Sequence, residues 1–231
     1  MNGLAKLINI TRSAAQLGRI IAPLNRSMFS SKDSHPRICQ NVTARLVERV
    51  ILPGIAALPV HEDVPKSGAQ SQEEFLEWAG KHFDNATASD ARAAFVLILA
   101  ATYERHLRRW MYRRQLHKAN TMPFEQLLGA GLDVLPDQGV AAELRLQLLE
   151  MVLVGNVLRH GNGRSVHDLR RLAPGLWHDL TPEDHQWAED TYLYAEQMRI
   201  GEERVRAYAN AIVLFWGLAD ALPGAVLHRG Y

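Results

Sequence analysis

Apolar positions recur at spacings of three and four residues along most of the chain, which is the pattern of one face of an α-helix. The strongest run predicts a helix over about 89–118, opening at Ser89 or Asp90. A capping box from Ser71 to Glu74 starts a shorter helix that we expect to reach about Phe83. Strand-like alternation does not occur in the sequence, so the pattern predicts an all-α bundle of four or five core helices with an N-terminal helical extension. The remaining helices are expected over about 4–21, 41–58, 123–128, 138–160, 165–172, 182–199 and 202–222.

Prolines and glycines suggest where this series of helices divides. Pro53 and Gly54 are expected to bend or break the helix over 41–58, and residues 25–40 look irregular. Residues 59–71 contain two prolines, a glycine and few apolar side chains, as linkers do. We therefore expect an N-terminal helical extension over 1–60 and a main helical domain over 72–222.

Composition narrows the class of protein and the kinds of partner. The 231 residues are 47% hydrophobic and carry a net charge of +1, so any contact with RNA requires a local basic patch. The single cysteine, Cys39, excludes an internal disulfide and fits a reducing compartment. No run of about 18 apolar residues occurs, so we expect no membrane span and a cytoplasmic location. Residues 1–32 contain five basic residues and no acid, which resembles a transit peptide, although we favour an amphipathic helix with a basic solvated face.

Signatures of bound cofactors and metals are missing. The sequence has no glycine-rich nucleotide loop after a strand, and its ten histidines lack the spacing of a zinc site. We expect no cofactor and no metal. We interpret Trp110, Trp177, Trp187 and Trp216, which lie on apolar stripes or beside prolines, as core residues.

Two stretches carry most of the candidate chemistry. In residues 155–165, GNVLRHGNGRS, the side chains of Asn156, Arg159 and His160 gather at a predicted helix end. The two cations there also fit a purely structural role, because positive side chains interact favourably with a helix C-terminus. The second stretch is a basic run in which Glu104 is the only acid between Arg92 and Lys118, and it is either a solvated face or a track for phosphates. Its basic members are Arg105, His106, Arg108, Arg109, Arg113, Arg114, His117 and Lys118.

The stretch from Gly155 to His160 resembles the signature of the HEPN superfamily, all-helical domains of prokaryotic defence and toxin–antitoxin systems. That signature is Arg-x(4–6)-His, often Arg-Asn-x-x-x-His, at the end of a core helix. The glycine turn and the later Pro174 and Trp177 are similar to one branch of the family, and the resemblance covers about residues 72–222. The chain departs from the signature at its arginine, which falls on Gly155, or on Leu153 or Val154 at the other spacings.

The resemblance implies a homodimer that cleaves RNA without a metal. It also implies a binding partner, either a cognate antitoxin or another defence-system protein. His160 would handle the proton of the attacking 2′-hydroxyl, and Asn156 would hold the geometry. Arg159 or Arg164 would have to replace the missing arginine, and Glu104 would supply an acid facing the motif. Arg105, Arg109 and Arg164 are the expected RNA-binding residues. The alternative is a non-catalytic module with this fold that binds a partner protein or RNA, and a third is a helical interaction protein without an active cleft.

Overall fold

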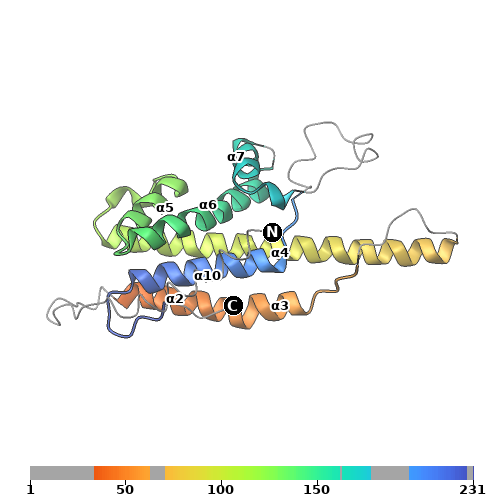
Figure 1. The fold of residues 1–231 in the computed structure, drawn as a ribbon, viewed down its shortest axis with the longest axis horizontal. Coiled ribbons are helices and arrows are strands. Elements are labelled where there is room, and N and C mark those ends of the chain that lie inside the picture. Colours follow the sequence, from red (N-terminus) through yellow and green to blue (C-terminus); the bar gives the residue numbers. More distant parts are fainter. Residues whose placement is uncertain (1–33, 63–70, 162, 178–197, 228–230) are drawn as a thin grey trace.

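A computed structural model describes residues 34–62, 71–161, 163–177, 198–227 and 231 of the chain. These residues form helices and loops without a named strand, and a lone antiparallel bridge joins Trp177 to Met198. The all-α prediction is confirmed. Figure 1 shows the helices lying roughly along one long axis, with α4 running through the middle. The predicted helices over 4–21 and 182–199, with Trp187, lie outside the described residues.

One helix dominates the molecule, namely α4, which runs without interruption over Gln72–Arg113. The predicted break near residues 84–88 is therefore wrong. The stretch contains no glycine or proline, and its polar side chains are satisfied: Thr87 donates to the carbonyl of Phe83, and Asn85 exchanges hydrogen bonds with the backbone of His61. The predicted cap is confirmed, because the Ser71 hydroxyl accepts from the amide of Glu74.

The N-terminal helices begin earlier than the sequence suggests. The helix α2, His35–Leu46, starts within the stretch predicted to be irregular, and Pro36 occupies its first turn, where its missing N–H costs nothing. The helix continues through a π-helical turn, η3, Val47–Ile51, into α3, Leu52–Ala56. Pro53 cannot donate a backbone hydrogen bond, and the wider π-helical turn ends two residues before it. The chain thus changes its helical geometry here without breaking.

The helices α5, Phe124–Asp133, and α6, Gln138–His160, form a hairpin that packs against α4. The α6 boundaries agree with the prediction. By contrast, α5 continues through Gly129 and Gly131, beyond the predicted helix end at about residue 128. A Cβ atom at Gly131 would lie 2.9 Å from a methyl group of Leu107, so this glycine allows α5 to approach α4 closely. A 3₁₀ turn, η5, His117–Asn120, joins α4 to α5.

The last helices close the bundle. The short helix α7, Arg164–Leu172, follows α6 and leads into the 3₁₀ turn η6, Pro174–Leu176. No side chain caps the start of α7, whose N-cap residue is Gly163. The final helix, α10, Glu202–Ala219, packs against α2, α4 and α6.

Aromatic side chains fill the centre of the bundle. The rings of Tyr103 and Trp110 from α4 contact those of Phe215 and Trp216 from α10 in edge-to-face arrangements. Cys39 and Ile51, from the predicted N-terminal extension, are buried in the same core. The described part of that extension therefore shares the hydrophobic core of the predicted domain over 72–222. Trp110 and Trp216 are core residues, as expected, whereas Trp177 is partly exposed beneath the guanidinium of Arg170.

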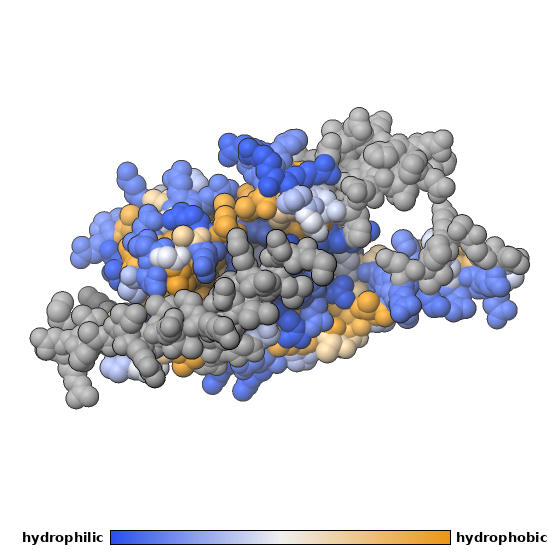
Figure 2. Space-filling view, in the orientation of Figure 1, coloured by the Kyte–Doolittle hydropathy of each residue, from blue (hydrophilic) through white to orange (hydrophobic). Residues whose placement is uncertain are grey.

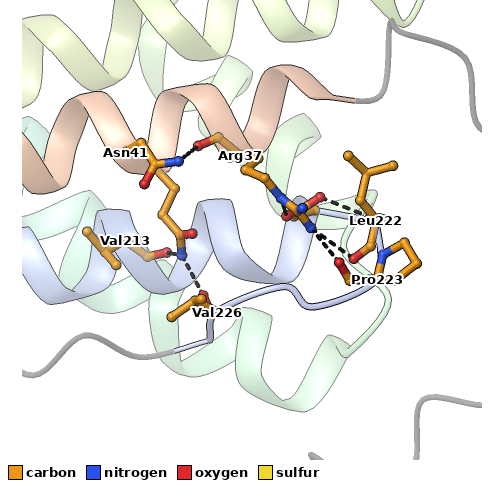
Figure 3. Close-up of polar contacts among 8 residues, drawn as sticks. Arg37, Asn41, Val213, Leu222, Pro223 and Val226 are labelled. Carbon is orange, nitrogen blue, oxygen red and sulfur yellow. Dashed lines mark hydrogen bonds and ion pairs between the residues drawn. The ribbon is translucent and has the colours of Figure 1, made fainter.

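Polar contacts fasten the segment after α10 onto α2 (Figure 3). The side-chain amide of Gln40 donates to the carbonyls of Val213 and Val226. Arg37 forms an ion pair with the buried carboxylate of Asp220 at 2.7 Å and donates to the carbonyl of Leu222. These bonds hold the C-terminal segment against both helices.

Candidate functional site

The C-terminal end of α6 places three of the predicted site residues on the surface. The helix ends at Gly161, whose φ of 64° is the left-handed conformation that favours glycine. The guanidinium of Arg159 donates to the carbonyl of Gly155 and to the side-chain oxygen of Asn156, at 2.9 Å in the second case. His160 is exposed beside them. The Arg159 side chain therefore runs along the surface of α6 towards its preceding turn, where it contacts Asn156.

Gly155, the residue at the position of the signature arginine, is buried where α6 packs against α4. An added Cβ atom would lie 3.5 Å from the Cβ of Ala100 on α4, which is an ordinary van der Waals contact. A longer side chain would have to enter the interface between α6 and α4. The packing of two helices thus accounts for a small residue at Gly155.

A second predicted set lines a groove on the solvent-facing side of α4. The groove has a volume of about 510 Å3, and three arginines, a tyrosine and an asparagine contribute to its walls. Arg105, Arg109 and Tyr112 are exposed, whereas Arg108 is half-buried. The guanidinium groups give the groove a positive character that suits phosphate or another anion. Its lining residues are Ala101, Glu104, Arg105, Arg108, Arg109, Tyr112 and Asn120.

Glu104 and Arg108 form a structural link within this groove. The Glu104 carboxylate accepts two hydrogen bonds from Arg108, the shorter at 2.6 Å. Arg108 also donates to the carbonyls of Ala119 and Met122, in and after η5. Asn156 accepts from Arg159, so the hydrogen bonds of Glu104 and Asn156 are made on different helices. The sequence places Arg108 in the basic run, but its structural role was missed because it depends on where the chain returns after α4.

Behind the groove, α2 and α4 bury a group of titratable side chains. The Nε2 atom of His35 lies 3.5 Å from the Cys39 sulfur, and Arg113 approaches the other ring nitrogen of His35. Burial raises the pKa of the Cys39 thiol to about 12, so this thiol does not serve as a nucleophile despite its histidine neighbour. Burial, followed by repulsion from His35, Arg105 and Arg109, lowers the pKa of His106 to about 4. The His106 ring and the Cys39 thiol are therefore both neutral near pH 7.

The predicted site residues therefore fall into two groups. One group, Asn156, Arg159 and His160, lies at the end of α6, and Arg164 follows it at the start of α7. The other group, Glu104, Arg105 and Arg109, lines the groove on α4. No hydrogen bond or ion pair between described residues joins the two groups.

Comparisons with known proteins assign the chain to no family. No family model matches the chain, and neither curated proteins nor solved structures yield a match. Within the described residues, no cluster of three or more histidine, cysteine or acidic side chains could hold a metal ion. None of the described helices combines the length and apolar character that crossing a membrane requires.

Proposed function

We propose that the protein is a helical RNA-binding module that contacts the phosphate backbone through the groove on α4. The observation that carries this proposal is the presence of Arg105, Arg108 and Arg109 around one groove with an exposed tyrosine. Guanidinium groups recognise phosphate oxygens through paired hydrogen bonds, and Tyr112 offers a ring on which a base can stack. Arg105 and Arg109 make the phosphate contacts, while Arg108 holds the shape of the groove.

The side chains of one protomer fit RNA binding better than RNA cleavage. A ribonuclease of the HEPN kind needs an arginine near the histidine to stabilise charge on the phosphate. Gly155 cannot supply it and lies in a helix interface. The motif resemblance supports a module of this superfamily, which we expect to act in the cytoplasm and to bind RNA or a defence-system partner.

A second candidate function is metal-independent cleavage of RNA at the end of α6. The observation that favours it is the hydrogen bond between Arg159 and Asn156, which keeps a guanidinium on the same surface as His160. In this reaction His160 accepts the proton of the 2′-hydroxyl, the 2′-oxygen attacks the phosphorus, and the 5′-oxygen leaves. Arg159 stabilises the charge on the phosphate oxygens, and a homodimer brings two such ends together.

Binding and cleavage are separated by two measurements on the same proteins. Fluorescence anisotropy with labelled single-stranded RNA at several salt concentrations measures the affinity of the wild type and of Arg105→Gln/Arg109→Gln. Loss of two phosphate contacts should weaken binding at least about tenfold and reduce the slope of log K against log salt by about 1.4. The matched control is Arg45→Gln/Arg49→Gln, which removes two exposed arginines of the same spacing from α2 and η3. Equal affinity of the groove variant and the control would contradict the groove proposal.

The cleavage assay uses the same RNA in EDTA with the wild type and His160→Ala. Absence of product from both proteins, alongside binding, is the result we expect for a non-catalytic module. Product from the wild type that is lost in His160→Ala would establish the second candidate instead, because EDTA removes metal-dependent contaminants. Equal cleavage by both proteins would exclude His160 from the reaction.

A further inference from the structure

The charges of α4 are divided between its two halves. Residues 72–90, which we call the arm, contain five acidic residues and one lysine. Residues 91–113 contain five arginines and one glutamate. Figure 1 shows the arm extending beyond the ends of α6 and α10, and Figure 2 shows hydrophilic residues over much of it on the face in view. A helix divided in this way is complementary to an antiparallel copy of itself.

An exposed apolar stripe runs along the same helix. Leu76 and Phe83 on the arm are 61% and 68% exposed, and Ile98 and Tyr112 further along are 42% and 49% exposed. At about 100° per residue, these four side chains and the exposed Ala94 and Ala101 fall within a sector about 60° wide. That sector faces away from the core residues Leu99, Tyr103 and Leu107, so the other helices that the structure describes leave it open.

The charged residues beside the stripe are placed for pairing. Glu73 and Arg109 both lie about 50° from the middle of the stripe on the same side, Glu77 lies further round on that side, and Arg105 lies at the stripe itself. The two pairs share a spacing of four residues. When two identical helices pack antiparallel about a twofold axis, each side of the stripe meets the same side of its partner. The acidic pair of one copy therefore faces the arginine pair of the other.

We infer that a second copy of this chain packs antiparallel along the stripe, so that the arm of each copy covers the arginine-lined groove of the other. The interface has Phe83 and Ile98 of the two copies near its middle, Leu76 towards each end, and a charged rim. This inference goes beyond the proposed function but uses the same arginines. A second copy and RNA therefore compete for Arg105 and Arg109.

A charge-swap experiment tests the pairing without RNA. The arm variant Glu73→Arg/Glu77→Arg places positive charges opposite the arginines of its own partner copy. The groove variant Arg105→Glu/Arg109→Glu places negative charges opposite the acidic arms. Sedimentation equilibrium should show a dimer for the wild type and a dimer dissociation constant at least about tenfold higher for each variant alone. A mixture of the two variants restores attraction at both contacts and should form a heterodimer. Arg45→Glu/Arg49→Glu is the matched control and should associate like the wild type.

Three outcomes would overturn the inference. One is a monomeric wild type, another is a wild-type dimer that both charge variants leave unchanged, and the third is a mixture that stays monomeric. All four substituted side chains are exposed, so each variant should fold, and circular dichroism checks this. The RNA-binding proposal stands or fails separately, because anisotropy of the monomeric arm variant measures the groove with its arginines intact. That variant should bind RNA at least as tightly as the wild type.

Discussion

Substitution of Gly155 distinguishes a packing position from a vacant catalytic one. Replacement by alanine adds a methyl group at an ordinary contact distance from Ala100 and removes the entropic cost of glycine in a helix interior. Gly155→Ala should therefore raise the free energy of unfolding by about 0.5–1 kcal/mol. Gly155→Arg instead forces three methylene groups and a charge into the interface between α6 and α4. Overpacking alone costs about 1–3 kcal/mol, and desolvation of the guanidinium adds to it.

The expected difference between the two variants is about 2–4 kcal/mol, which exceeds the error of urea unfolding followed by tryptophan fluorescence. Leu146→Arg is the control, because it places the same side chain at a 58% exposed position of the same helix and should change stability by less than about 0.5 kcal/mol. A Gly155→Arg protein as stable as the wild type would refute the packing argument. If that protein also cleaved RNA in EDTA, the position would be an accessible site for the signature arginine.

Two further predictions concern buried polar groups. Because the pKa of His106 in the folded protein is lowered to about 4, the unfolded chain binds its proton first as the pH falls below 6.5. Stability present above pH 6.5 should decline by about 1–2 kcal/mol towards pH 4, a loss that His106→Gln should reduce in urea titrations at both pH values. Glu150, a buried residue, accepts hydrogen bonds at 2.6 Å from both Arg204 and Tyr208. Glu150→Ala should cost about 3 kcal/mol in thermal or urea unfolding, and a cost below about 1 kcal/mol would show that the network contributes little.

Local signals explain which elements of the fold could be predicted. Local residues mark both ends of α6, because Asp137 caps its first turn and Gly161 adopts the left-handed conformation after its last turn. The continuity of α4 was not predictable in the same way. Ser89 and Asp90 are typical of a helix start, yet within a continuous helix their side chains can point towards solvent on the partly exposed side. The predicted end of α5 at about residue 128 was too early, because the packing that favours Gly131, the close approach of Leu107, involves another helix.

The candidate site was predictable only where its contacts are local. Arg159 and Asn156 are three residues apart on a helix, so their hydrogen bond follows from spacing. Glu104 was expected to face the motif on α6, a role that remains a prediction, and its observed partner Arg108 lies one turn away on its own helix. The neighbour of Gly155 is Ala100, 55 residues earlier, and no sequence pattern announces such a contact. The residues that surround the motif are therefore determined by long-range packing, which its sequence pattern does not predict.

The basic run of α4 shows why a count of cations overstates the surface open to RNA. Arg108 is bound to Glu104 and two carbonyls, Arg114 lies over the ring of Trp110, and His106 lies beside the buried ring of Trp216. Within the groove, Arg105 and Arg109 remain as the exposed arginines. Two phosphate contacts give a shallow dependence on salt and a modest affinity. Tight binding would require phosphate contacts elsewhere as well, and the exposed Arg159 and Arg164 at the end of α6 are the next place to measure them.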